Sequence, residues 1–111
     1  ADGQALSQGS YDMNFAPMPD EFTLHQNYPN PFNPVTQIRY DLPEKSNVTL
    51  LIYDILGREV ATLLNGELEP GYHSVMWNGQ NKMGQTVGAG MYFYSIQAGE
   101  FRQTKKMVLL K

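Results

Sequence analysis

The clearest pattern along the chain is an alternation of apolar and polar residues in short runs that are interrupted by turns. In residues 35–42, VTQIRYDL, the side chains of Ile38, Tyr40 and Leu42 fall on one face and polar side chains on the other. Residues 71–77, GYHSVMW, alternate in the same way. Successive side chains of a β-strand point to opposite faces. Both runs therefore predict strands with one face buried.

Other runs predict strands of different character. Residues 48–54, VTLLIYD, are nearly all apolar and rich in β-branched and aromatic side chains, which predicts a strand in the centre of a sheet. Residues 91–98 and 101–111 predict a hairpin over Ala98, Gly99 and Glu100. Residues 21–27 predict a short first strand.

A weaker strand is expected in EVATLLNG, where Asn65-Gly66 predicts a closing turn. Residues 78–90 are punctuated by glycines and predict a long loop. No run shows a sustained helical periodicity.

The strand count and the composition together predict the fold class. The chain has ten Gly, seven Pro, seven Tyr and five Phe, which suits many short strands and turns. About seven strands separated by turns every ~8–12 residues indicate an all-β protein, an immunoglobulin-like antiparallel β-sandwich. Residues 1–21 are small, polar and aperiodic, so we expect a linker or flexible N-terminal tail, followed by one domain over residues 22–111.

Asparagine and proline alternate in the segment NYPNPFNP, residues 27–34. Each proline fixes its own φ and favours an extended conformation in the residue before it. The sequence therefore predicts a rigid crossover that carries the first strand from one sheet to the other, with Tyr28 and Phe32 filling the gap between the sheets. The alternative is a proline-rich ligand for another protein, but such ligands normally lie outside a fold.

Charge and composition exclude several classes of protein. Eight basic and eleven acidic residues give a formal charge of −3, which argues against nucleic-acid binding. The absence of cysteine excludes disulfides and thiol chemistry. No apolar run approaches the ~20 residues that a membrane-spanning helix needs, so no transmembrane segment is expected.

Catalytic and metal-binding patterns are missing from the sequence. His25 and His73 lie far apart and lack further ligands at metal-binding spacing. No serine lies in a nucleophile-elbow motif. The loop 78–84 has amide oxygens but no carboxylate, which favours an Asx turn over a calcium site. We therefore expect no enzyme activity, no metal and no cofactor.

Two predicted strands are apolar on both faces, although a two-layer sandwich buries only one face of each sheet. One face carries Leu51, Tyr53, Met91 and Phe93, and the other carries Leu50, Ile52, Tyr92 and Tyr94, so one of the two lies outside the core. Either another segment covers this face or it is a docking patch. Exposed tyrosines could also stack on sugars, which keeps a carbohydrate-binding module open.

Four blocks of sequence carry a resemblance to a known family: LHQNYPNPFNPVTQIRYDLP, VTLLIYDILGREVATL, GYHSVMWNGQNKMGQTVGAGMYFYSI and the ending KKMVLLK. Together they span about four fifths of the chain. The chain resembles the type A C-terminal sorting domain of type IX secretion cargo, whose fold is related to the immunoglobulin-like domain of flagellar hook-capping proteins.

The resemblance implies a sorting module at the end of a longer exported protein. Such cargo passes through the periplasm to an outer-membrane type IX translocon, and a sortase-like peptidase then removes the domain, leaving the passenger secreted or on the cell surface. By resemblance, the signal comprises Pro29, Asn30, Pro31, Gly90, Tyr92, Lys105, Lys106 and Lys111. The last strand is the best candidate for direct recognition, because an edge strand offers backbone groups for pairing.

Two alternatives stand beside a sorting role. A carbohydrate-binding or adhesion module would use the tyrosine-rich strands, with Tyr53 and Tyr94 as the expected contacts. An immunoglobulin-like spacer or assembly subunit would need no site of its own.

Overall fold

The alternating runs form strands in the computed structural model, which describes residues 18–110. The strands are β1 (Thr23–Leu24), β2 (Thr36–Leu42), β3 (Ser46–Tyr53), β4 (Glu59–Leu68), β5 (Gly71–Trp77), β6 (Gly90–Ala98) and β7 (Phe101–Leu109). Residues 18–110 contain no helix, as the sequence predicts.

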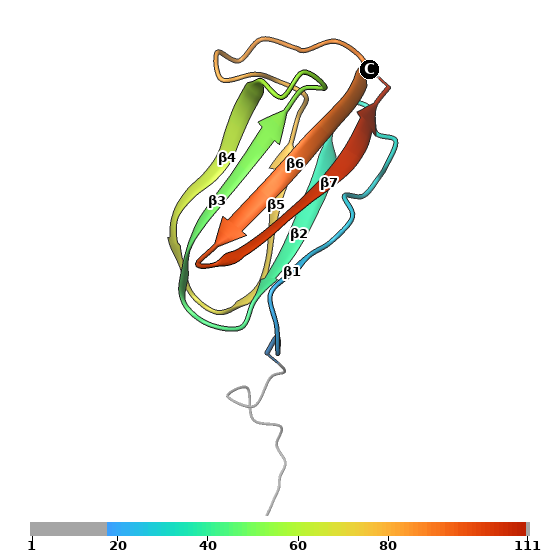
Figure 1. Cartoon of the computed structure of the whole chain (residues 1–111). Helices are drawn as coiled ribbons and strands as arrows, with labels where there is room; N and C mark the ends of the chain where they lie inside the picture. Colours follow the sequence, from blue (N-terminus) through green and yellow to red (C-terminus); the bar gives the residue numbers. More distant parts are fainter. Residues whose placement is uncertain (1–17, 111) are drawn as a thin grey trace, which may run out of the picture.

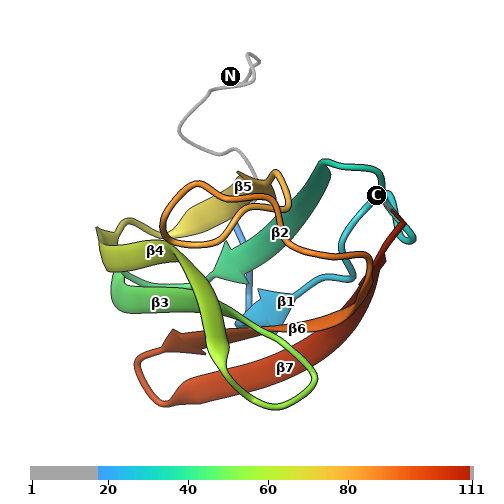
Figure 2. The ribbon, with the colours of Figure 1, turned by 90° about the horizontal axis from the view of Figure 1, so that it is seen from above.

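The seven strands form two antiparallel sheets that face each other. One sheet has three strands in the order β1-β2-β5, and the other has four in the order β4-β3-β6-β7. In Figure 1 the four-stranded sheet lies in front, and Figure 2 shows the two layers from above. The predicted immunoglobulin-like sandwich is confirmed, and β3 lies inside its sheet as its apolar sequence predicts.

The core lies between the sheets, on the faces that the alternation assigns. The three-stranded sheet contributes Ile38, Tyr40 and Leu42 from β2, each at most 2% exposed. The facing sheet contributes alternate residues of its inner strands together with the end of β7: Val48, Leu50, Ile52, Tyr94, Ile96, Met107 and Leu109. Burial of this apolar area is the main driving force for folding.

Strand β4 differs from the prediction, because no turn forms at Asn65-Gly66. Asn65 pairs with Thr49 and Gly66 with Val48, so the strand continues to Leu68. A turn at Asn65 would leave the first residues of β3 without partners on this side. Gly66 is tolerated there because β4 is an edge strand and the position is exposed.

The first strand of the domain is shorter than the predicted strand in residues 21–27. Strand β1 has two residues, and it pairs through Thr23 with Asp41 and through Leu24 with Tyr40. Pro19 is already buried, so the packed part of the chain includes at least that residue of the expected tail. Residues 1–17 of the expected tail lie outside the described residues.

The asparagine–proline segment does not connect the two sheets in the predicted way, because β1 and β2 are neighbours in the same sheet. It leaves the three-stranded sheet, contacts β7 of the other sheet through Phe32, and returns to β2. Phe32 fills the gap between the sheets as predicted, at 1% exposure. Tyr28 does not, at 78% exposure: Asn27 points inward, so the next residue of this extended segment points outward.

Candidate recognition site at the end of strand β7

Three segments far apart in the sequence meet at the end of β7. The amide of Val108 donates a hydrogen bond to Asn30 Oδ1 at 3.0 Å. The amide of Phe32 donates to the Val108 carbonyl at 2.9 Å, and the amide of Leu110 donates to the Phe32 carbonyl at 2.8 Å. On the other side of the strand, Leu109 pairs with Gly90 of β6. The asparagine–proline segment thus extends the four-stranded sheet beyond β7.

A cluster of aromatic side chains supports this end of the sandwich. The rings of Phe32 and Trp77 lie 5.8 Å apart, and those of Trp77 and Tyr92 lie 5.4 Å apart, edge to face. Trp77 Nε1 donates to the Gln80 carbonyl, and the Tyr92 hydroxyl donates to the Gly88 carbonyl. Burial raises the pKa of Tyr92, with a smaller contribution from the charge of Asp54.

A buried polar network fixes the start of the asparagine–proline segment. The Tyr94 hydroxyl donates to the His25 carbonyl at 2.7 Å and accepts from the Asn27 amide at 2.8 Å. Asn27 Nδ2 donates to Thr36 Oγ1, which donates in turn to the Pro29 carbonyl. Burial raises the pKa of Tyr94 to about 12, because the charged phenolate would lie in the core.

No specific pattern in the sequence predicts this network. Asn27 and Thr36 are polar residues next to a proline segment, which usually indicates an exposed turn, yet both are at most 2% exposed. The weak signal that could have found them is their position: Asn27 begins the segment and Thr36 lies two residues after its last proline, where backbone groups lack strand partners.

Two glycines at this end have backbone conformations that favour glycine. Gly79 has a φ of +75°, and a Cβ there would lie 3.4 Å from the Pro34 carbonyl oxygen. Gly90 has a φ of +145°, a conformation that L-residues rarely adopt. A shallow cavity of about 320 Å³ lies beside them, lined by Asn33, Pro34, Gly79, Thr86, Val87 and Leu109.

The residues predicted from the family resemblance only partly lie together. Asn30, Gly90 and Tyr92 surround the end of β7, and Pro29 and Pro31 are exposed on the segment beside it. Lys106 is exposed on the outer face of the sheet, while Lys105 points the opposite way and is half-buried. Lys111 lies outside the described residues.

The outward edge of β7 is only partly occupied. Both backbone groups of Val108 point away from β6, and alternate residues of a regular antiparallel strand point the same way. The register from Gly90–Leu109 to Ala98–Phe101 has no shift, so the backbone groups of Arg102, Thr104 and Lys106 also point outward. Gln26 Nε2 donates to the Lys106 carbonyl at 2.9 Å. Within residues 18–110, the outward backbone groups of Arg102 and Thr104 have no hydrogen-bond partner.

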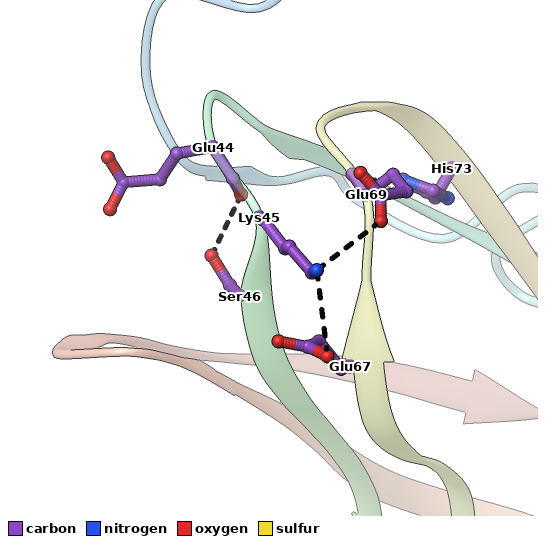
Figure 3. A network of polar contacts seen from close by, with 6 residues as sticks. All are labelled: Glu44, Lys45, Ser46, Glu67, Glu69 and His73. Carbon is purple, nitrogen blue, oxygen red and sulfur yellow. Dashed lines mark hydrogen bonds and ion pairs between the residues drawn. The ribbon is translucent and has the colours of Figure 1, made fainter.

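The opposite edge of the same sheet, β4, has a different construction. Its register with β3 shifts twice, which leaves Val60 and Leu63 as extra residues in two bulges. The amide of Lys82 donates a hydrogen bond to the Val60 carbonyl. Near the other end of β4, Lys45 Nζ lies 3.9 Å from carboxylate oxygens of both Glu67 and Glu69 (Figure 3). Bulges and charges of this kind obstruct pairing with a further strand.

The polar residues considered for chemistry have structural partners. His25 Nε2 lies 2.9 Å from Asp41 Oδ2 on the neighbouring strand, and His73 Nε2 lies 2.8 Å from the Glu69 carbonyl. Asn81 Oδ1 accepts from the amides of Met83 and Gln85, which confirms the predicted Asx turn.

Two kinds of site are missing from the part of the chain that the structure describes. No group of three His, Asp or Glu side chains converges there in a way that could hold a metal ion. Residues 18–110 also include no helix of the length and hydropathy that crossing a bilayer requires. Of the two tyrosines expected to contact a sugar, Tyr94 is wholly buried and cannot stack on a sugar as predicted, whereas Tyr53 is half-buried.

Two facing antiparallel sheets with seven strands define an immunoglobulin-like β-sandwich. The family model described as the FlgD Ig-like domain matches residues 33–100, more than half of the chain. The chain belongs to this family. A comparison with curated protein sequences finds no match.

Solved structures share the fold at low sequence identity. Latent PorU from Porphyromonas gingivalis matches 76% of this chain at 23% identity, with a TM-score of 0.59, and PorZ from the same organism matches 83% at 19% identity, with a TM-score of 0.54. The DNA glycosylase AlkC from Pseudomonas fluorescens matches 80% at 14% identity, with a TM-score of 0.50. The matches cover 9% of the PorU chain, 12% of the PorZ chain and 30% of the AlkC chain.

Proposed function

We propose that this domain is a non-catalytic sorting module that directs a covalently attached passenger across the outer membrane through a type IX secretion system. The observation that carries the proposal is the meeting of three sequence blocks at β7: Asn30 and Phe32, the start of β6, and the last strand itself. These are the blocks in which the chain resembles C-terminal sorting domains. Support also comes from PorZ, a fold neighbour described as an essential surface component of the type IX secretion system.

Recognition in this proposal uses the unoccupied part of the β7 edge. A strand of the translocon would pair with the outward backbone groups of Arg102 and Thr104, because unpaired edge groups are a template for an added strand. The exposed Lys106 side chain lies next to this stretch and adds a charge contact. The clamp formed by Asn30 and Phe32 fixes where the added strand must end.

The passenger would precede the domain, and a sortase-like peptidase would cut the chain within or near residues 1–21. The domain itself would contribute no catalytic group, since its histidines are held in structural contacts. The product of this route is a passenger that is secreted or attached to the cell surface. The fold alone does not determine this role, because a DNA glycosylase contains a domain of similar fold.

The experiment is a fusion of the full chain to a reporter that folds in the periplasm, expressed in a bacterium with a type IX secretion system. We expect the reporter at the cell surface or in the medium. A reporter that stays in the periplasm, while a known cargo of the same cells is exported, would contradict the proposal.

A pair of variants at one position tests the edge itself. Thr104→Pro removes an outward N–H and adds bulk on the edge, a place where strands tolerate proline. Thr104→Ala keeps the N–H and is the matched control. We expect the proline variant to stop export and the alanine variant to preserve it, with the folding of both checked by circular dichroism. Equal export of the two variants would rule out strand pairing at this position.

A further inference from the structure

The outer face of the four-stranded sheet carries a row of side chains with opposite charges at its two ends. The register pairs Glu59 of β4 with Tyr53 of β3, Tyr53 with Phe93 of β6, and Phe93 with Lys106 of β7. Directly paired residues of neighbouring strands point to the same face. The neighbours of Phe93 in β6, Tyr92 and Tyr94, are buried in the core, so this row points outward.

This face is apolar at its centre, and no segment of residues 18–110 covers it. Leu51, Tyr53, Phe93 and Val108 are each only half-buried, and Met91 is 40% exposed. The face is turned toward the viewer in Figure 1, and no described segment crosses it. A contiguous apolar surface of this kind is typical of an interface.

The order of the row is self-complementary. Consider a two-fold axis that lies outside the face, above the gap between β3 and β6 and nearly parallel to the strands. It places the row of a second copy over the row of the first in reversed order. Glu59 of one copy then faces Lys106 of the other, and Tyr53 faces Phe93, so each contact occurs twice. We propose that this face binds a second copy of the same chain, sheet against sheet, around the row from Glu59 to Lys106.

The dimensions of packed sheets suit these contacts. Two sheets that pack face to face lie about 10 Å apart with their strands inclined by about 30°, which brings aromatic side chains into contact and leaves room for long charged side chains at the rim. Lys106 is exposed. Glu59 Oε2 lies 3.6 Å from Lys82 Nζ and accepts a hydrogen bond from Thr62. Its other carboxylate oxygen has no partner among residues 18–110.

The charges argue for a second copy over a different partner. The neighbouring row on this face ends in Thr104 on β7 and Thr62 on β4, and neither residue is charged. The row beyond it ends in Arg102 on β7 and Asn65 on β4, so its base has no complementary acid. Glu59 and Lys106 therefore lie at the two ends of the same row, as a two-fold pairing of identical faces requires. The proposal is independent of any role in secretion.

Sedimentation velocity of the full chain at increasing concentration tests the proposal. We expect a monomer–dimer equilibrium. Phe93→Glu places a charge at the centre of the face and should leave a folded monomer. A wild-type protein that stays monomeric at every concentration would overturn the proposal and leave the face to another occupant, such as a preceding domain.

Charge exchange tests the two-fold arrangement even if the Phe93 variant fails to fold. Lys106→Glu alone sets two acidic side chains against each other twice and should raise the dimer Kd by about tenfold. Combining it with Glu59→Lys restores opposite charges and should return the Kd to near the wild-type value. Arg102→Glu makes the same charge change two rows away, against Asn65, and should have little effect. A Kd that the exchange does not restore, or that Arg102→Glu raises equally, would overturn the proposal.

Discussion

The two outer edges of the four-stranded sheet are protected by different means. Strand β4 is irregular in its own backbone, with bulges at Val60 and Leu63. Strand β7 is regular along its whole length. Among residues 18–110, its outward edge is covered where residues 30–32 pair with Val108 and Leu110 and where Gln26 donates to the Lys106 carbonyl. One edge is closed by its own geometry, and the other is closed in part by a clamp.

The difference indicates where an added strand could bind. A bulged edge cannot continue a ladder, whereas a regular edge with unpaired groups can. The clamp on β7 depends on buried side chains, above all Phe32 and Tyr94, which are at most 1% exposed. The contacts that cover β4 near its end are ion pairs between exposed side chains. The following predictions separate these two kinds of protection.

The largest effect is expected from removing the clamp's anchor. Phe32→Ala deletes a buried ring in contact with Trp77 and should lower the free energy of unfolding by about 3–5 kcal/mol. Leu63→Ala, in a bulge of β4 and only half-buried, should cost roughly 1–2 kcal/mol. Urea denaturation measures both values. Equal losses would mean that the clamp contributes no more than the bulged edge.

A pH effect is expected from the tyrosine that holds the clamp. The pKa of Tyr94 is raised to about 12 in the folded protein, while an unfolded tyrosine has a pKa of about 10. The stabilisation that comes from keeping Tyr94 protonated in the fold is therefore complete below pH 10. As the pH rises from about 10 to about 12, the free energy of unfolding should fall by up to about 3 kcal/mol. Denaturation of Tyr94→Phe across this range should show a smaller decline, although burial also raises the pKa of Tyr40 and Tyr92 in both proteins. Identical declines would contradict the assignment.

A smaller effect is expected from the polar half of the clamp. Asn30→Ala removes the acceptor of the Val108 amide at an exposed site, where water can replace it. The free energy of unfolding should fall by about 0.5–1.5 kcal/mol. Asn33→Ala is the matched control, because Asn33 is exposed and its side chain makes no hydrogen bond with residues 18–110. Thermal denaturation that ranks the two variants in the opposite order would contradict this role of Asn30.

The smallest effect is expected at the far end of β4. Lys45→Ala breaks ion pairs with Glu67 and Glu69, and all three side chains are more than half exposed. The loss should be below about 1 kcal/mol and should vanish in high salt. A larger loss that salt does not reduce would mean that the β4 edge depends on these charges.

The fold could be predicted from local patterns because strands carry their own period. The alternation in β2 and β5 and the apolar run in β3 depend only on which face each side chain meets. The turn predicted at Asn65-Gly66 was wrong, because the dipeptide favours a turn only locally. Its pairing with Thr49 and Val48 depends on the neighbouring strand of the sheet.

The site was harder to predict for the same reason. The prolines indicate a stiff segment, but its partner is β7, nearly eighty residues away in the sequence. The burial of Asn27 and the exposure of Tyr28 follow from how that segment lies against Tyr94 and Gln37, and no local pattern encodes this. The residues named from the family resemblance predicted that the site lies at the end of β7, but they did not predict its contacts.

Hydrogen exchange of individual backbone amides in β7 tests the half-open edge most directly. We expect fast exchange at Arg102 and Thr104, whose amides face outward and have no partner among residues 18–110. Exchange should be slow at Val108, whose amide donates to Asn30, and at Gln103, whose amide faces β6. Slow exchange along the whole strand, or an amide of Val108 that exchanges as fast as that of Thr104, would contradict the account.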